Sequence, residues 1–140
     1  MKLFLIIIGF SFISVFGISQ TASITIKVSN IENVKGEMII AIFNSAAGFP
    51  DGDTYFIGKK VAVKSKEFKY VINDIPFGTY AIAIYQDLDK NGEFDKNWIG
   101  IPSEPYGFTY KNVGETGSVD FNEATFELKG DKVVSIKLID

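Results

Sequence analysis

Short segments in which apolar and polar residues alternate recur along this chain, and this period of two constrains the fold more than any other feature. In residues 23–29, Ile24, Ile26 and Val28 share one face of the predicted strand. Similar strand-like patterns occur in residues 60–64, 67–72, 80–85, 124–128 and 133–139. Residues 37–43 are apolar on both faces, as expected of a central strand. No segment keeps a helical period, so the sequence predicts an all-β protein.

Turn-forming residues separate these segments. Pro76 and Gly78 punctuate residues 74–79, and Gly130 precedes Asp131 between the last two predicted strands. Ser65 and Lys66 are expected to form a tight turn between two further strands. About seven short strands with turns between them predict an antiparallel β-sandwich with Greek-key connections.

The first 19 residues have the features of a secretory signal peptide. Lys2 precedes an apolar run, and Gly17 and Ser19 are small enough for the −3 and −1 positions of a cleavage site. The run is shorter than the ~20 residues that a transmembrane helix needs. We therefore expect cleavage after Ser19, a single domain over residues 20–140, and a secreted or periplasmic location.

The composition excludes several classes of chemistry. The chain has no cysteine, histidine or arginine, and its net charge is −3. Without cysteine and histidine it cannot form a Ser-His-Asp triad or the usual zinc site. A mildly acidic chain without arginine is poorly suited to nucleic acid. We expect a monomeric protein that is not an enzyme, has no membrane span after signal cleavage, and binds a protein or glycan partner at the cell envelope.

One segment has the spacing of a calcium-binding loop. It reads D-x-D-x-N-G-x-x-D, with a glycine at position six for a sharp turn. The oxygen donors would come from Asp87, Asp89, Asn91, the carbonyl of Glu93, and Asp95. In an EF-hand, position twelve would be a bidentate glutamate, but here it is Trp98. The loop also follows a strand rather than a helix, so it is not an EF-hand.

The calcium shell is incomplete within this loop and needs a ligand from elsewhere in the chain. Glu104, Asp51 and Asp53 are candidates, because they lie in turn-rich segments that can meet the loop at one end of the sandwich. A structural alternative is a polar hairpin or Ω-loop in which the Asx side chains bond their own backbone. If Ca²⁺ binds, we favour a structural role in which the ion offsets repulsion between carboxylates.

Aromatic residues gather in the two long irregular segments. They are Phe49, Tyr55, Phe56, Trp98, Tyr106, Phe108 and Tyr110. Trp98, Tyr106 and Phe108 are candidates for a platform that stacks on a sugar or peptide. The alternative, which we favour, is a satellite core that holds the long loops against the sandwich.

The chain also resembles a known bacterial family. The motifs FNSAAGFP (43–50), IPFGTYAIAI (75–84), the acidic loop (87–95) and GIPSEPYGF (100–108) occur in the order typical of the DUF2141 family, small secreted proteins of unknown function. Residues 121–126 resemble its strand before the C-terminus. The resemblance implies an extracytoplasmic immunoglobulin-like or transthyretin-like sandwich, and the family has no assigned activity to carry over to this chain. The family typically has histidine before the first aspartate of the loop, where this chain has Gln86.

These observations together predict a secreted β-sandwich module with a binding or structural role, stabilised by Ca²⁺ at residues 87–95. One alternative is a carbohydrate-binding or ligand-binding module that uses the aromatic loops. Another is a small hydrolase that uses two acids among Asp87, Asp89 and Asp95, although no nucleophile motif accompanies them.

Overall fold

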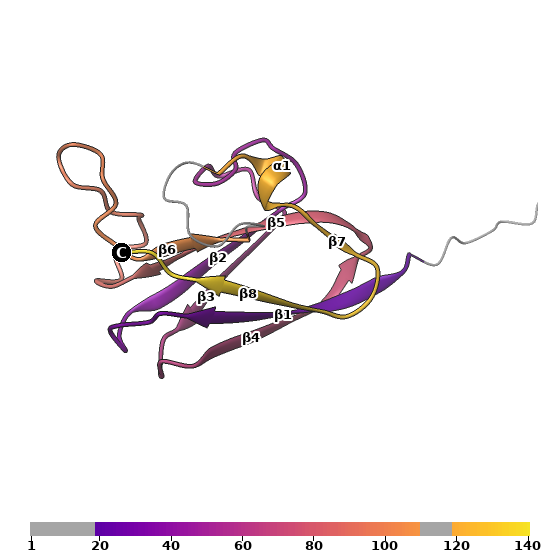
Figure 1. Ribbon diagram of the computed structural model, residues 1–140, viewed down its shortest axis with the longest axis horizontal. Helices are drawn as coiled ribbons and strands as arrows, with labels where there is room; N and C mark the ends of the chain where they lie inside the picture. Colours follow the sequence, from indigo (N-terminus) through magenta and orange to yellow (C-terminus); the bar gives the residue numbers. More distant parts are fainter. Residues whose placement is uncertain (1–18, 110–118) are drawn as a thin grey trace, which may run out of the picture.

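The computed structural model describes residues 19–109 and 119–140, and this part of the chain is an all-β sandwich (Figure 1). The expected signal peptide lies outside the described residues, except for Ser19. The elements are β1 (Thr21–Ser29), β2 (Glu37–Phe43), β3 (Ile57–Ala62), β4 (Phe68–Pro76), β5 (Gly78–Asp87), β6 (Tyr106–Phe108), α1 (Phe121–Ala124), β7 (Phe126–Leu128) and β8 (Lys132–Lys137).

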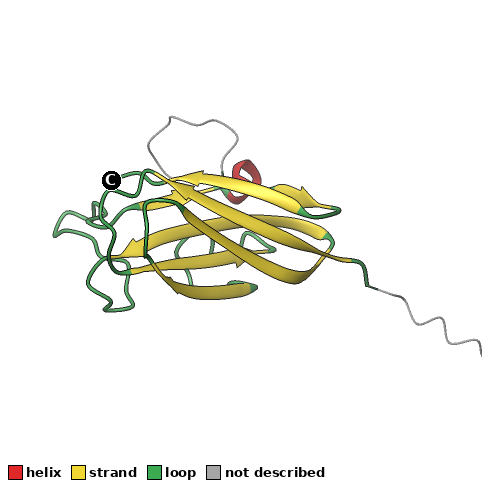
Figure 2. Cartoon of the chain, turned by 90° about the horizontal axis from the view of Figure 1, so that it is seen from below, coloured by secondary structure: helices red, strands yellow, loops and turns green. Residues whose placement is uncertain are grey.

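The strands form two layers, which Figure 2 shows from below. One sheet has the order β4-β1-β8, in which β1 is antiparallel to β4 and parallel to β8. The other has the order β3-β2-β5-β6, with β7 paired to the start of β5, and all its pairs are antiparallel. The predicted sandwich is therefore confirmed, and the parallel β1–β8 pair is a detail that the alternation pattern does not encode.

The core lies between the two sheets and follows the period of two. Ile24, Ile26 and Val28 of β1 face the alternate residues of β2 and β5 and are buried. The partners from those two strands are Met38, Ile40, Ile42, Tyr80, Ile82 and Ile84. Fully burying a large aliphatic side chain contributes about 1.5–3 kcal/mol. The inner faces therefore fix the register of each strand, because a shift by one residue would turn them outward.

The turn at Ser65 does not make a hairpin. The Ser65 hydroxyl donates to the carbonyl oxygen of Glu67 at 2.6 Å, but β3 pairs with β2 and β4 pairs with β1. The chain thus crosses from one sheet to the other at this point. The chain crosses between the sheets a second time at Phe77, the only residue between β4 and β5. The turn predicted at residues 74–79 is therefore shorter than expected, because β4 continues to Pro76.

The outer face of β5 carries a second, smaller core. Ala81 packs with Val119 and Ala124, and three phenylalanines cover them. These rings belong to Phe49, Phe108 and Phe121. The small alanine on this face leaves room for the covering segments. Residues 121–124, which resembled a strand, form the helical turn α1 instead, closed by a capping box between Asp120 and Glu123.

No helix in residues 19–109 and 119–140 is long and apolar enough to cross a membrane.

Candidate metal centre

The acidic loop begins with a fully buried carboxylate. Asp87 is the last residue of β5 and has no exposed surface. Its Oδ2 accepts a hydrogen bond from the backbone N–H of Gly92 at 2.8 Å. Its Oδ1 is buried and has no hydrogen-bond partner among the described residues. Burying an unpaired carboxylate oxygen is costly, so this atom is well suited to a cation as its partner.

Side chains within the loop hold its backbone in a tight curve. Asp89 Oδ1 accepts a hydrogen bond from the N–H of Asn91 at 3.1 Å, and Asn91 Oδ1 accepts one from the N–H of Glu93 at 2.8 Å. The Asn91 amide also donates to both oxygens of Asp95, at 3.1 and 3.0 Å. These are the Asx turns that a purely structural loop would make. The loop is therefore shaped by its own hydrogen bonds.

Glu104 lies in the turn before β6 and contacts the acidic loop. One carboxylate oxygen each from Asp87, Asp89 and Glu104 lie within 4.8 Å of one another. Glu104 is 5 % exposed. Its Oε1 accepts a hydrogen bond from the N–H of Leu88 at 2.8 Å, and its Oε2 accepts one from the N–H of Asp95 at 3.2 Å. Glu104 thus joins both ends of the loop and places a third carboxylate beside Asp87 and Asp89.

The cluster creates a strongly negative environment. Burial, and then the charges of Asp87, Glu104, Asp95 and Glu93, raise the pKa of the nearby Tyr85 hydroxyl to about 12. That hydroxyl donates to the carbonyl oxygen of Gly92 at 3.3 Å. Within the described part of the chain, no lysine forms an ion pair with the three clustered carboxylates. A divalent cation is the kind of ligand that would balance this charge.

The other two acids proposed as remote ligands are not in the cluster. Asp51 forms a solvent-exposed ion pair with Lys96, with Oδ2 and Nζ 3.3 Å apart. Asp53 is exposed and does not lie with the three clustered carboxylates. Of the three acids that the sequence nominated, the structure brings only Glu104 to Asp87 and Asp89.

Two residues that the sequence did not nominate hold Asp87 in place. Gln86 is fully buried, and its Nε2 donates to the carbonyl oxygens of Asn33 and Lys35 at 2.7 and 2.8 Å. Gly36 passes so close to the backbone of Asp87 that a Cβ there would overlap its carbonyl oxygen. The sequence shows a glycine directly before a strand, which is a signal for a close backbone approach. It does not show that the backbone in question is that of Asp87.

The aromatic residues form a continuous line of rings from the helical turn to the acidic loop. Neighbouring ring centres lie 5.1–6.1 Å apart, mostly tilted or edge-to-face. The members are Phe43, Phe49, Phe121, Phe108, Tyr106, Phe94 and Tyr85. In edge-to-face packing the edge of one ring covers the face of its neighbour, so that face is not available to a ligand. This arrangement favours the satellite core over a stacking platform.

Trp98 stands apart from the other two residues of the proposed platform. Tyr106 and Phe108 lie 5.6 Å apart, centre to centre. Trp98 is 95 % exposed and stacks on no other ring in the described residues. Tyr110, the last of the aromatic set, lies outside the described residues.

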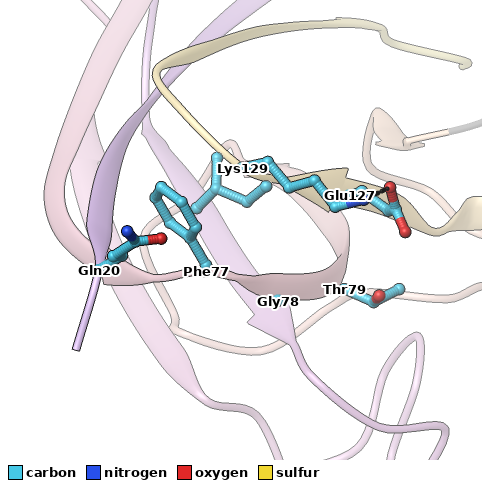
Figure 3. Close-up of a pocket in the computed structure, with 7 residues that line it drawn as sticks. Gln20, Phe77, Gly78, Thr79, Glu127 and Lys129 are labelled. Atoms are coloured by element: carbon cyan, nitrogen blue, oxygen red, sulfur yellow. Dashed lines mark ion pairs between the residues drawn. The ribbon is translucent and has the colours of Figure 1, made fainter. Parts of the chain in front are cut away.

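A pocket of about 440 Å³ lies where β4 passes into β5, beside β7 (Figure 3). Its walls include Gln20, Phe77 and Leu128. The ion pair between Lys129 and Glu127, with atoms 2.9 Å apart, lies along one side. None of its lining residues belongs to the carboxylate cluster. This pocket is therefore separate from the candidate metal centre.

Glu104 should make the stability of the metal-free protein depend on pH. Burial raises its pKa, the N–H groups of Leu88 and Asp95 lower it less, and the charges of Asp87 and Asp95 raise it further. A raised pKa means that the folded state binds the proton more tightly than the unfolded chain. The stability from this proton is therefore present below the unfolded pKa and is lost as the pH rises through the folded pKa.

A Glu104→Gln variant isolates this effect because the amide stays neutral. In calcium-free buffer, the free energy of unfolding of the wild type should fall relative to that of the variant as the pH rises. Urea denaturation between about pH 4 and pH 8 measures the difference, since this range brackets carboxyl titration. Parallel pH profiles for the two proteins would contradict the prediction.

Comparison with known proteins places this geometry in a family. Residues 26–137, which run from β1 to the end of β8 and include the whole acidic loop and Glu104, match one family over most of the chain. No curated protein and no solved structure matches the chain. The chain belongs to the family described as "Uncharacterized protein conserved in bacteria (DUF2141)".

Proposed function

We propose that this protein is a secreted β-sandwich module that binds Ca²⁺ at residues 87–95 and Glu104, and that the ion has a structural role. The observation that carries the proposal is the unpartnered, fully buried Oδ1 of Asp87, a residue whose carboxylate is clustered with those of Asp89 and Glu104. In an acidic turn stabilised only by its own Asx bonds, a buried carboxylate oxygen without a partner would cost free energy that nothing offsets.

The donor chemistry favours calcium over other ions. All donors are hard oxygens, and neither the thiolate nor the imidazole that zinc prefers occurs in the chain. Asp87, Asp89 and Glu104 would supply carboxylates, and Asn91, the Glu93 carbonyl and Asp95 would complete the shell. Ca²⁺ accepts six to eight oxygens in flexible geometry, whereas Mg²⁺ demands a near-ideal octahedron. An irregular loop closed by a remote glutamate suits the larger ion.

A structural role follows from what the ion would connect. Asp87 ends β5, and Glu104 precedes β6, which pairs with the same strand. The intervening residues form a long loop that lies outside the sheets (Figure 1). A cation between the two carboxylates would tie both ends of this loop together and offset their repulsion.

An extracytoplasmic location agrees with such a site. Calcium sites of extracellular modules bind with dissociation constants of about 10⁻⁴–10⁻³ M, so moderate affinity is enough there. The N-terminal segment with signal-peptide features supports the same location.

Thermal melting tests the proposal directly. The chain from Gln20 onward contains every described strand. With about 10 mM calcium, 10 to 100 times the expected dissociation constant, the folded state gains roughly 1.4–2.7 kcal/mol. We expect the melting temperature to rise by about 5–10 °C relative to a sample with chelator.

Magnesium at the same concentration is the matched control, and it should raise the melting temperature far less. Equal melting temperatures in calcium and in chelator would refute the proposal. An equal rise in melting temperature with both ions would mean that the ions screen the carboxylates without a specific calcium site.

A further inference from the structure

Beyond the acidic loop, the chain forms an apolar tip at residues 97–102. The segment reads Asn-Trp-Ile-Gly-Ile-Pro and contains no charged side chain. Trp98, Ile99 and Ile101 are 95, 56 and 54 % exposed. In Figure 1 the connection between β5 and β6 extends beyond the ends of the strands, in orange on the left. Three large apolar side chains on one protruding loop are unusual in water and indicate an interaction site.

Four of the five backbone N–H groups of the tip donate hydrogen bonds within the tip. The N–H of Asn97 donates to the carbonyl of Ile101 at 2.8 Å, and the N–H of Gly100 donates to the carbonyl of Asn97 at 2.9 Å. The Asn97 side-chain oxygen accepts from the N–H groups of Ile99 and Ile101 at 3.1 and 3.0 Å. These four N–H groups therefore need no water, which suits a segment that enters an apolar medium.

The base of the tip is closed and charged. Lys96 forms a β-bridge with Pro102, and the N–H of Ser103 donates to the carbonyl of Asp95 at 2.9 Å. The Lys96 ammonium pairs with Asp51 at 3.3 Å. The molecule thus changes from charged to apolar over a single residue, as it would at the boundary between headgroups and acyl chains.

We propose that residues 97–102 anchor the protein to a phospholipid surface with zwitterionic headgroups. A glycan would need ring faces flanked by polar side chains, but the tip offers two isoleucines, and its one polar side chain, Asn97, bonds its own backbone. A protein partner would need a matching apolar cavity, whereas a lipid surface accepts an apolar protrusion of any shape. Trp98 suits this position because tryptophan favours the bilayer interface.

The charge around the tip selects the headgroup. The adjacent loop carries Asp87, Asp89, Glu93 and Asp95 against Lys90. An anionic surface would therefore repel the acidic loop, while a zwitterionic surface would not. The inference does not rest on the calcium proposal, because the tip is closed by hydrogen bonds of its own.

Fluorescence provides a direct test, because Trp98 is the only tryptophan. The chain from Gln20 onward is titrated with phosphatidylcholine vesicles in buffer with chelator, in which the acidic loop keeps its full negative charge. We expect the Trp98 emission to shift to the blue and to be quenched by lipids brominated on their acyl chains. The double variant Ile99→Ser/Ile101→Ser keeps Trp98 and should partition into vesicles at least about tenfold less, because most of the aliphatic surface of the tip is lost.

Val133→Ser is the matched control, since Val133 is 58 % exposed but lies on β8, away from the tip. It should bind vesicles as the wild type does. The inference is overturned if vesicles leave the emission unchanged, or if the double variant partitions like the wild type. It is also overturned if the blue shift appears with protein concentration alone, which would mean that the tip packs against a second copy. A calcium-dependent rise in melting temperature without vesicle binding would refute only the anchor.

Discussion

Replacing Asp87 by asparagine should abolish most of the calcium-dependent rise in melting temperature. The substitution removes the charge from the buried Oδ1 but keeps an oxygen that can accept the Gly92 N–H. We expect calcium affinity to fall by about 100-fold or more, equivalent to about 2.7 kcal/mol. In chelator the variant should be at least as stable as the wild type, because it relieves repulsion with Asp89 and Glu104. Differential scanning calorimetry with calcium and with chelator measures both effects.

Asp131→Asn is the matched control for this experiment. Asp131 also lies in a turn and accepts a backbone N–H, from Ser23 at 2.8 Å. It lies between β7 and β8, away from the acidic loop (Figure 1). Its loss removes the same unit of charge and should leave the calcium response unchanged. If Asp87→Asn kept the full response, or if Asp131→Asn lost it, the acidic loop would not be the binding site.

Part of the candidate site could be predicted from local spacing, and part could not. Asp87, Asp89 and Asn91 occupy every second position and are followed by a glycine, which is a pattern of neighbouring residues. The structure shows the Asx turns that this spacing permits. Glu104 was one of three candidates because its position depends on how the chain returns to β5. The chain pairs with β5 again through β6, a strand of three residues. The sequence around β6 is rich in turn-forming residues and does not predict a strand there. A site closed by a distant residue is fixed by topology rather than by spacing.

The fold shows the same division. Burial alternates with a period of two along β1 and most of β2, because each side of a strand meets one environment. β5 is buried on both faces, because the second core covers its outer face. The alternation does not say which strands pair. The tight turn predicted at Ser65 therefore carries no information on pairing, and its two strands belong to different sheets. The helical turn α1 has four residues, too few to show a helical period.

Gly36→Ala should destabilise the protein strongly, although it adds only one methyl group. Gly36 has a φ of +73°, a left-handed conformation that costs alanine about 1 kcal/mol or more. The new Cβ would also overlap the Asp87 carbonyl oxygen and lie 2.9 Å from the Leu88 Cα, and neither backbone atom can move freely. Overpacking of this kind costs roughly 1–3 kcal/mol. We expect a total loss of about 3 kcal/mol and a fall in melting temperature of about 10 °C.

Gly100→Ala separates the two causes. Gly100 has a similar φ of +83°, but a Cβ there would have no atom within 4 Å. This variant should lose only the conformational part, about 1 kcal/mol. Urea denaturation in chelator measures the loss of stability in both variants. Equal losses would show that position 36 does not need glycine because of the contact with Asp87. If the contact does require it, Gly36→Ala must displace Asp87 or its neighbours. The calcium response of that variant should then fall as well, while Gly100→Ala keeps it.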